Sequence, residues 1–138
     1  MIRRNTLDFS TSDFIDKMIG VPWANRACSF ERVDCWGLCV LYYRHVMGIE
    51  LHQTPDYEAG ADFFTCYQGD VVYWKKVDKP VEGGIFVGYR ASQPAHVGLI
   101  LNRKALHSRG ENGSVREDSL LVIQRAFTKV EYFVYGAD

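Results

Sequence analysis

A cysteine at the start of an apolar helix is the first group in the sequence that could do covalent chemistry. Cys35 follows Asp34 and opens a stretch with helical spacing of apolar side chains up to Met47, with Gly48 as a stop signal. Unpaired N–H groups at a helix N-terminus favour an anion, so a nucleophilic thiol with a lowered pKa is expected there. The same groups could stabilise an oxyanion. Position alone does not exclude the commoner role of cysteine as a small buried apolar residue.

Two histidines could supply a base and a group that orients it. Residues 95–101 alternate as a strand, so that His96 and Gly98 share one face and leave space for a groove. A two-residue hairpin loop at Asn102-Arg103 would place His107 opposite Gly98, on the face that carries His96. A three-residue loop without a bulge would separate the two imidazoles onto opposite faces, so the inference depends on the register.

These three residues suit distinct roles in cysteine-dependent acyl transfer. A nucleophilic thiol needs a base within hydrogen-bond reach, and the base needs a polar partner that selects its tautomer. Cys35, His96 and His107 occur in the order nucleophile, base and orienting group. That order is the one found in papain-like folds.

The remaining cysteines and histidines are not expected to take part in chemistry. Without a C-x-x-C pair or a secretory signal, Cys28, Cys39 and Cys66 are not expected to form a disulfide framework. A zinc site built from dispersed cysteine and histidine is a minor alternative, and we expect neither a metal nor an organic cofactor. His45 and His52 are interpreted as solvated, one on a helix face and one in a loop.

The order of the elements predicts an α+β fold with N-terminal helices, including a buried central one, packed on an antiparallel sheet. A first helix is expected at residues 11–18, capped by Ser10 or Thr11, and the central helix at residues 34–47. The stretch 49–79 is weakly patterned, and residues 70–74 fit either a short strand or a helix. Strands are expected at residues 85–87, 97–101, 105–108, 121–123 and 130–135.

Length and composition fit a single domain over residues 1–138. Apolar residues make up 47% of the chain and charged residues 24%, which is typical of globular proteins. The formal net charge of -1 gives no global attraction for nucleic acid. No apolar run is long enough to span a membrane, and no secretory signal is recognised, so synthesis in the cytoplasm is expected.

The chemical residues lie in motifs that resemble the NlpC-type cell-wall peptidases. The resemblance runs from about residue 11 to the C-terminus, and its cysteine and histidine motifs are specific when they occur together at this spacing. The resemblance implies a circularly permuted papain-like fold. The matching segments are Gly20-Val21-Pro22-Trp23, Asp34-Cys35-Trp36-Gly37-Leu38, Ala95-His96-Val97-Gly98-Leu99-Ile100 and Leu106-His107-Ser108.

By resemblance, the expected activity is hydrolysis of peptidoglycan stem peptides, usually between D-glutamate and meso-diaminopimelate. Cys35 would be the nucleophile, His96 the base and His107 the third polar residue. Trp23 matches a position where relatives often carry a tyrosine near the oxyanion, although a packed aromatic is an equal alternative. Asp34 could contact substrate or cap the helix. Trp36 could wall the groove or belong to the core.

The Trp after Cys35 and the Tyr42-Tyr43-Arg44 segment are similar to the branch found in phage tails and gene transfer agents. This resemblance implies a virion component, with tail-assembly proteins as partners and delivery to the periplasm of a target cell. One alternative is a structural tail plug on the same fold with slow or lost catalysis. Another is a papain-like acyltransferase or amidase that acts on lipid or protein.

Overall fold

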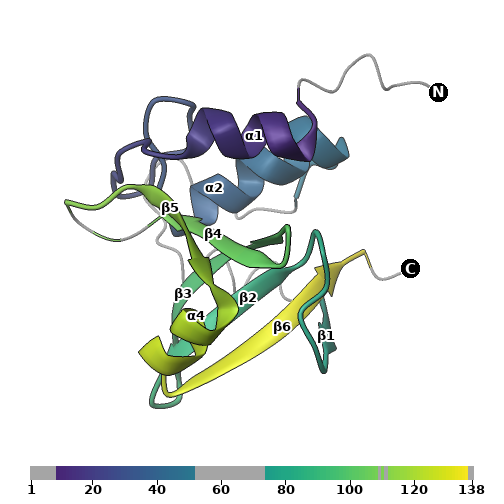
Figure 1. The fold of residues 1–138 in the computed structure, drawn as a ribbon, viewed down its shortest axis with the longest axis vertical. Coiled ribbons are helices and arrows are strands. Elements are labelled where there is room, and N and C mark those ends of the chain that lie inside the picture. Colours follow the sequence, from purple (N-terminus) through teal and green to yellow (C-terminus); the bar gives the residue numbers. More distant parts are fainter. Residues whose placement is uncertain (1–8, 52–73, 109, 111, 137–138) are drawn as a thin grey trace.

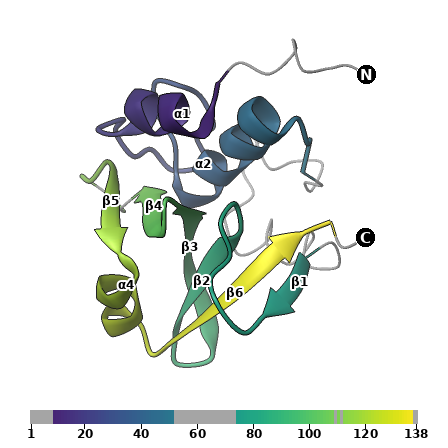
Figure 2. The ribbon, with the colours of Figure 1, turned by 45° about the vertical axis from the view of Figure 1, so that its right-hand side comes forward.

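The computed structural model describes residues 9–51, 74–108, 110 and 112–136. Helices α1 and α2 lie together on one side of a twisted sheet, and α4 lies apart from them beside the sheet (Figures 1 and 2). The helices are α1 (Thr11–Met18), α2 (Cys35–Tyr42) and α4 (Leu120–Ala126), with a π-helical turn over Tyr43–Met47; the strands are β1 (Trp74–Val77), β2 (Ile85–Arg90), β3 (Gln93–Leu101), β4 (Lys104–Ser108), β5 (Val115–Ser119) and β6 (Lys129–Tyr135).

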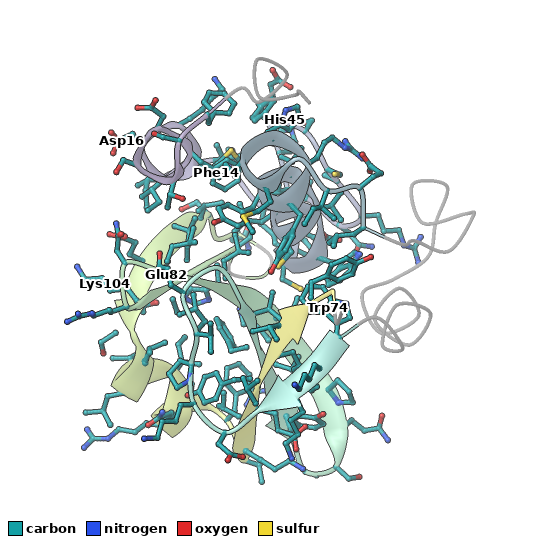
Figure 3. All side chains as sticks on the ribbon, turned by 90° about the vertical axis from the view of Figure 1, so that its right-hand side faces the viewer. Phe14, Asp16, His45, Trp74, Glu82 and Lys104 are labelled. Atoms are coloured by element: carbon teal, nitrogen blue, oxygen red, sulfur yellow. The ribbon has the colours of Figure 1, made fainter. Side chains whose placement is uncertain are left out.

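Helix α1 has the predicted bounds and the predicted cap. The Ser10 hydroxyl accepts a hydrogen bond from the Asp13 backbone N–H at 3.1 Å, which satisfies one of the unpaired donors of the first turn. Phe14 and Met18 are fully buried on the inner side. Figure 3 shows Phe14 between the two helices, whereas Asp16 points outward.

Helix α2 is buried all round, as its apolar pattern predicts, because every residue from Cys35 to Tyr42 is buried. Asp34 caps it by accepting from the Gly37 backbone N–H at 2.7 Å. A Cβ at Gly37 would lie 2.0 Å from the Ala27 carbonyl oxygen, so only glycine lets the preceding loop pack against the helix start. The helix continues as a π-helical turn and stops at Gly48, which adopts the left-handed conformation with φ +72°.

The sheet has six strands in the order β1-β6-β2-β3-β4-β5, and every neighbouring pair is antiparallel. The β3–β4 hairpin turns through Asn102 and Arg103, both with positive φ, and pairs Leu101 with Lys104 as predicted. Glu82 stabilises this turn, because its carboxylate accepts from the Asn102 backbone N–H at 2.9 Å.

Alternation along the strands gives the sheet two buried faces with separate cores. One face packs against α1 and α2 through Ile85, Val97, Leu99 and Leu106, among others. The other face packs against α4 and contains Phe86, Ile100, Ala105, Ile123 and Tyr132.

One predicted strand is wrong. Residues 121–123 belong to α4, which begins after Ser119, whose hydroxyl accepts from the Val122 backbone N–H at 3.2 Å. The run Leu120–Ile123 contains residue types that are common in strands. However, Leu120 and Ile123, which are spaced like residues on one side of a helix, pack into the second core. Strand β5 was not predicted, because its sequence is mostly polar, as is common for an edge strand. Most of the unassigned stretch 49–79 lies outside the described residues, and its described part includes β1.

None of the helices in the described part of the chain is both long and apolar enough to cross a membrane.

Candidate active site

The two predicted histidines meet on the α4 side of the sheet. His96 Nε2 lies 2.8 Å from His107 Nδ1, within hydrogen-bond distance. Gly98 makes this approach possible, because a Cβ there would lie 2.8 Å from His107 Cβ and 2.5 Å from the Phe86 ring. The predicted register therefore brings the two imidazoles together.

His96 lies where the sheet is locally irregular. The pairing shifts between Gly88↔His96 and Tyr89↔Pro94, so Ala95 is an extra residue in β3. Strand β4 ends at Ser108, one residue before the position that would face His96 in the β3–β4 register. His96 thus lies beside this irregularity, while His107 is held inside the sheet and is only 2% exposed.

Asp118 extends the pair of histidines into a chain of three side chains. Its Oδ2 lies 2.8 Å from His107 Nε2, and its Oδ1 accepts from Arg116 Nη2 at 2.9 Å. Burial raises the pKa of Asp118, but the hydrogen bonds from His107 and Arg116 outweigh burial and lower the pKa overall. The Asp118 side chain is therefore a carboxylate at neutral pH.

The Cys35 thiol contacts the backbone of β3 at the residue after His96. The backbone N–H groups of Val97, Trp36 and Cys35 itself favour the anion of the sulfur and lower the pKa of the thiol. Burial and the Asp34 carboxylate act in the opposite direction and raise the pKa of Cys35 to about 12. The expected lowering of this pKa is therefore wrong for the resting protein, because helix-start N–H groups cannot offset burial beside a capping carboxylate.

An aromatic ring packs against His96 on the side of α4. The Phe127 and His96 rings stack with their planes 17° apart and their centroids 5.8 Å apart. The Arg90 guanidinium carbon lies 5.0 Å from the Phe127 ring centroid. A Cβ at Gly88 would lie 2.6 Å from the Phe127 ring, so Gly88 lets this ring lie close to the strand.

A cavity of about 290 Å³ opens beside the histidines, between the sheet and α4. Its walls combine the polar side chains His96, His107 and Asp118 with the apolar Val122 and Phe127, and Arg90 is also part of the lining. The cavity is therefore small and largely polar, and both histidines and Asp118 face it.

Three further predicted site residues have different outcomes. Trp36 is fully buried and packs edge-on against Trp74 with ring centroids 6.3 Å apart, so it belongs to the core and cannot wall a groove. Asp34 accepts from the Arg26 and Gly37 backbone N–H groups, so the capping interpretation describes it. Trp23 is partly buried, and its backbone bridges to Val33 before the helix start.

The other cysteines and histidines lie away from this site or outside the described residues. Cys39 is fully buried in α2, and Cys28 lies 3.6 Å from the Gly37 carbonyl oxygen. His45 is half-buried against the Phe30 ring rather than fully solvated. Cys66 and His52 lie outside the described residues. Within the described ranges, no group of three or more His, Cys, Asp or Glu side chains is arranged to hold a metal ion.

Asp118, Phe127 and Gly88 are the site residues that sequence reasoning missed. A signal for Asp118 existed in Asn112-Gly113, a dipeptide typical of hairpin turns, followed by alternating residues. The connection from Ser108 to Val115 is too long for that turn to fix the register. Gly88 and Phe127 carry no sequence signal, because their contact joins β2 to the end of α4.

A model of the NlpC/P60 family matches residues 20–131, most of the chain. The chain belongs to the NlpC/P60 family. No curated protein matched the sequence.

Several solved NlpC/P60 structures share the fold. The NlpC/p60 domain of the peptidoglycan hydrolase SagA superposes with a TM-score of 0.61 at 17% identity, covering 91% of this chain and 95% of that one. NlpC1 from Trichomonas vaginalis gives a TM-score of 0.64 at 14% identity, covering 93% of this chain and 44% of that one. A protein from Staphylococcus aureus described as similar to a lipoprotein of the NLP/P60 family gives 0.62 at 15% identity, covering 99% and 46%.

These comparisons confirm the predicted papain-like α+β fold of the NlpC/P60 family. The chain spans nearly all of the SagA domain but less than half of the Trichomonas and Staphylococcus chains. At these identities the structural similarity concerns the fold alone. The roles of individual residues depend on the chemistry of the site itself.

Proposed function

We propose that this NlpC/P60 protein is a cysteine endopeptidase that hydrolyses peptide stems of bacterial peptidoglycan. Cys35 is the nucleophile, His96 the base and His107 the residue that orients the base. The observation that carries the proposal is the 2.8 Å contact between His96 Nε2 and His107 Nδ1, next to the strand backbone that contacts the Cys35 thiol. Activation of a thiol requires an oriented base close to it, and the contact with His107 supports the orientation of His96.

The proposed reaction proceeds through a thioester. The proton of the Cys35 thiol moves to His96 Nδ1 while the sulfur attacks the scissile carbonyl carbon. The backbone N–H groups at the start of α2 lie beside the sulfur and stabilise the developing oxyanion. The C–N bond then breaks, and His96 protonates the leaving amine. Water attacks the thioester with His96 again as the base, which restores the thiol and releases the carboxylic acid.

The raised pKa of Cys35 makes proton transfer to His96 part of the attack. A thiol with a pKa of about 12 is protonated at neutral pH, so it becomes a strong nucleophile only as its proton leaves. The acyl acceptor in this proposal is water, and the bond proposed for cleavage joins D-glutamate, through its γ-carboxyl, to diaminopimelate. Arg90 lines the cavity beside His96 and supplies a cation that suits such a carboxylate-rich peptide.

Removal of the nucleophile tests this proposal. Cys35→Ala should abolish the release of cleaved stem peptides from purified peptidoglycan, measured by mass spectrometry of muropeptides. Cys28→Ala is the matched control. Cys28 is a partly buried cysteine that also lies near the start of α2, 3.6 Å from the Gly37 carbonyl oxygen, but it has no role in the proposed reaction. The control should retain cleavage. Unchanged cleavage by a folded Cys35→Ala protein would exclude Cys35 as the nucleophile.

One observation favours a second candidate, a structural protein on the same fold without turnover. Cys35 is only 9% exposed and its thiol is protonated at neutral pH, as expected for a packed cysteine. This candidate predicts that the wild-type protein releases no stem peptides and that Cys35→Ala still binds its partner proteins. Muropeptide analysis of the wild-type protein therefore separates the two functions.

We also propose that the protein acts as a component of a phage or prophage tail and reaches the periplasm of a target cell with the virion. The Asp34-Cys35-Trp36 start of α2 and its Tyr42-Tyr43-Arg44 continuation support this context by resemblance. Mass spectrometry of purified virions should detect the chain together with tail-assembly proteins. Its absence from virions that the same cells produce would contradict the tail role.

A further inference from the structure

The hydrogen-bonded chain behind His96 does not end at the residue assigned to orient it. His107 contacts His96 through Nδ1 and Asp118 through Nε2, both at 2.8 Å. Both ends of the His107 imidazole are therefore engaged, and its side chain is only 3% exposed. A buried ring held in this way has a tautomer set by its two partners.

The chemistry of the three groups allows only one arrangement of protons that leaves His96 able to act as a base. An ionised carboxylate can only accept hydrogen bonds, so His107 must donate through Nε2–H to Asp118. Neutral His107 then has a lone pair on Nδ1 and accepts from His96 Nε2–H. Neutral His96 consequently carries its own lone pair on Nδ1, the nitrogen that takes the proton from the thiol.

We infer that Asp118 is a positioning residue that selects the tautomer of His107 and, through it, the tautomer of His96. The inference rests on the proposed function for its catalytic meaning. The opposite tautomer would set the lone pair of His107 Nε2 against the Asp118 carboxylate at 2.8 Å. That tautomer would also force a proton onto His96 Nδ1 and remove the base.

Arg116 fixes the carboxylate in place. Its Nη2 donates to Asp118 Oδ1 at 2.9 Å, so that one oxygen of Asp118 binds Arg116 and the other binds His107. Arg116 and Asp118 alternate with Glu117 along β5, and Arg116 pairs with His107 in the β4–β5 register. The pairing of β4 with β5 therefore fixes the position of Asp118 beside His107, and the Asp118 side chain is 9% exposed.

The tautomers can be measured without any substrate. Long-range proton–nitrogen correlation spectra of the full chain labelled with ¹⁵N-histidine report which ring nitrogen carries the proton. In the wild-type protein, His107 and His96 should both be protonated on Nε2 and unprotonated on Nδ1 at neutral pH. A wild-type His107 protonated on Nδ1 would overturn the inference, whether or not any variant folds.

A variant pair then tests the role of Asp118. Asp118→Ala should give a mixture of His107 tautomers and a kcat lower by about 10- to 100-fold with little change in KM, because base alignment is a part of the roughly 10²- to 10⁴-fold contributed by acid–base catalysis. Glu117→Gln removes the same charge from the adjacent residue, which faces the other side of β5, and should leave spectra and kcat unchanged. An unchanged His107 tautomer in folded Asp118→Ala would overturn the inference.

The two proposals fail in distinguishable ways. If wild-type protein shows the expected tautomers but does not cleave peptidoglycan, the assigned proton arrangement stands and the proposed function fails. If wild-type protein cleaves peptidoglycan but His107 carries its proton on Nδ1, the positioning role fails and the peptidase function stands.

Discussion

At the residue scale, Cys35 is subject to opposing electrostatic effects. Burial and the Asp34 carboxylate raise its pKa, while three backbone N–H groups lower it. Asp34 thus has two consequences from one position: it caps the helix and disfavours the thiolate at the helix start. A nucleophile kept neutral in this way reacts when a base accepts its proton, rather than as a standing thiolate.

This balance predicts how Cys35 reacts with iodoacetamide. Only the thiolate is alkylated, and the pKa of an ordinary cysteine is about 8.5. The alkylation rate at Cys35 should therefore still rise about tenfold per pH unit at pH values well above that pKa. The raised pKa of about 12 places the plateau beyond the usual range of such titrations. Mass spectrometry of the Cys35 peptide measures the rate at each pH. A plateau near neutral pH would indicate a thiolate–imidazolium pair instead.

The Asp34→Asn variant belongs to the same experiment. Asparagine keeps a capping oxygen but removes the negative charge, so the pKa of Cys35 should fall and alkylation at a fixed pH should accelerate. Glu31→Gln is the control, because Glu31 is exposed and does not contribute to the raised pKa of Cys35.

At the element scale, the hairpin of β3 and β4 decides whether the histidines can meet. Its two-residue turn fixes the register, and the register puts Gly98 between the Phe86 ring and His107. A side chain at this position would have to displace one of these neighbours. The glycine therefore serves the site by leaving space for His107.

Gly98→Ala should disturb both stability and activity. Its Cβ would lie 2.5 Å from Phe86 and 2.8 Å from His107 Cβ, and overpacking of this kind costs about 1–3 kcal/mol of the free energy of unfolding. Shifting His107 should also lengthen its contact with His96 and lower kcat. Urea denaturation and muropeptide release measure the two effects.

Gly110→Ala is the matched control for stability, because a Cβ at Gly110 meets nothing within 4 Å. Its unfolding midpoint should stay close to that of the wild-type protein. An equal midpoint for Gly98→Ala would show that the sheet accommodates the added methyl group.

At the scale of the whole molecule, the sheet separates two cores, and the proposed catalytic residues come from both sides of it. The nucleophile belongs to the helical side, whereas His96, His107 and Asp118 line a cavity on the α4 side. Any approach between thiol and imidazole therefore depends on the packing of α2 against β3 and β4. A second carboxylate, Glu131, is similarly tied into the sheet by Lys76 and Tyr89.

The two tied carboxylates predict that stability falls in acid. For both Asp118 and Glu131, hydrogen bonds outweigh burial and lower the pKa in the folded protein. A lowered folded pKa adds stability that is present above the unfolded pKa, about 3.9 for Asp and 4.3 for Glu, and is lost as pH falls through the folded pKa. The urea midpoint should therefore decrease from pH 5 downward.

Asp118→Asn and Glu131→Gln should each flatten this pH dependence, because neither side chain then releases a proton on folding. Asp16→Asn serves as the control, since Asp16 points outward from α1 (Figure 3). A wild-type midpoint that stays constant between pH 5 and pH 3 would contradict the expected linkage.

The sequence by itself determined the elements that depend on local chemistry. Ser10 and Asp34 cap helices where their side chains predict, Gly48 ends the central helix, and Asn102-Arg103 sets the β3–β4 register. Each of these depends on residues close together in the chain. Local hydrogen bonding and backbone sterics therefore suffice to predict them.

Only the tertiary structure decided what depends on contacts between distant segments. The run Leu120–Ile123 has the residue types of a strand but forms a helix, because it covers the second core. Asp118 reaches His107 through a strand pairing that no tight turn fixes, and the thiol of Cys35 keeps a high pKa because packing removes it from water. Burial and pairing between distant strands arise only when the chain is folded, which is why they could not be inferred from spacing.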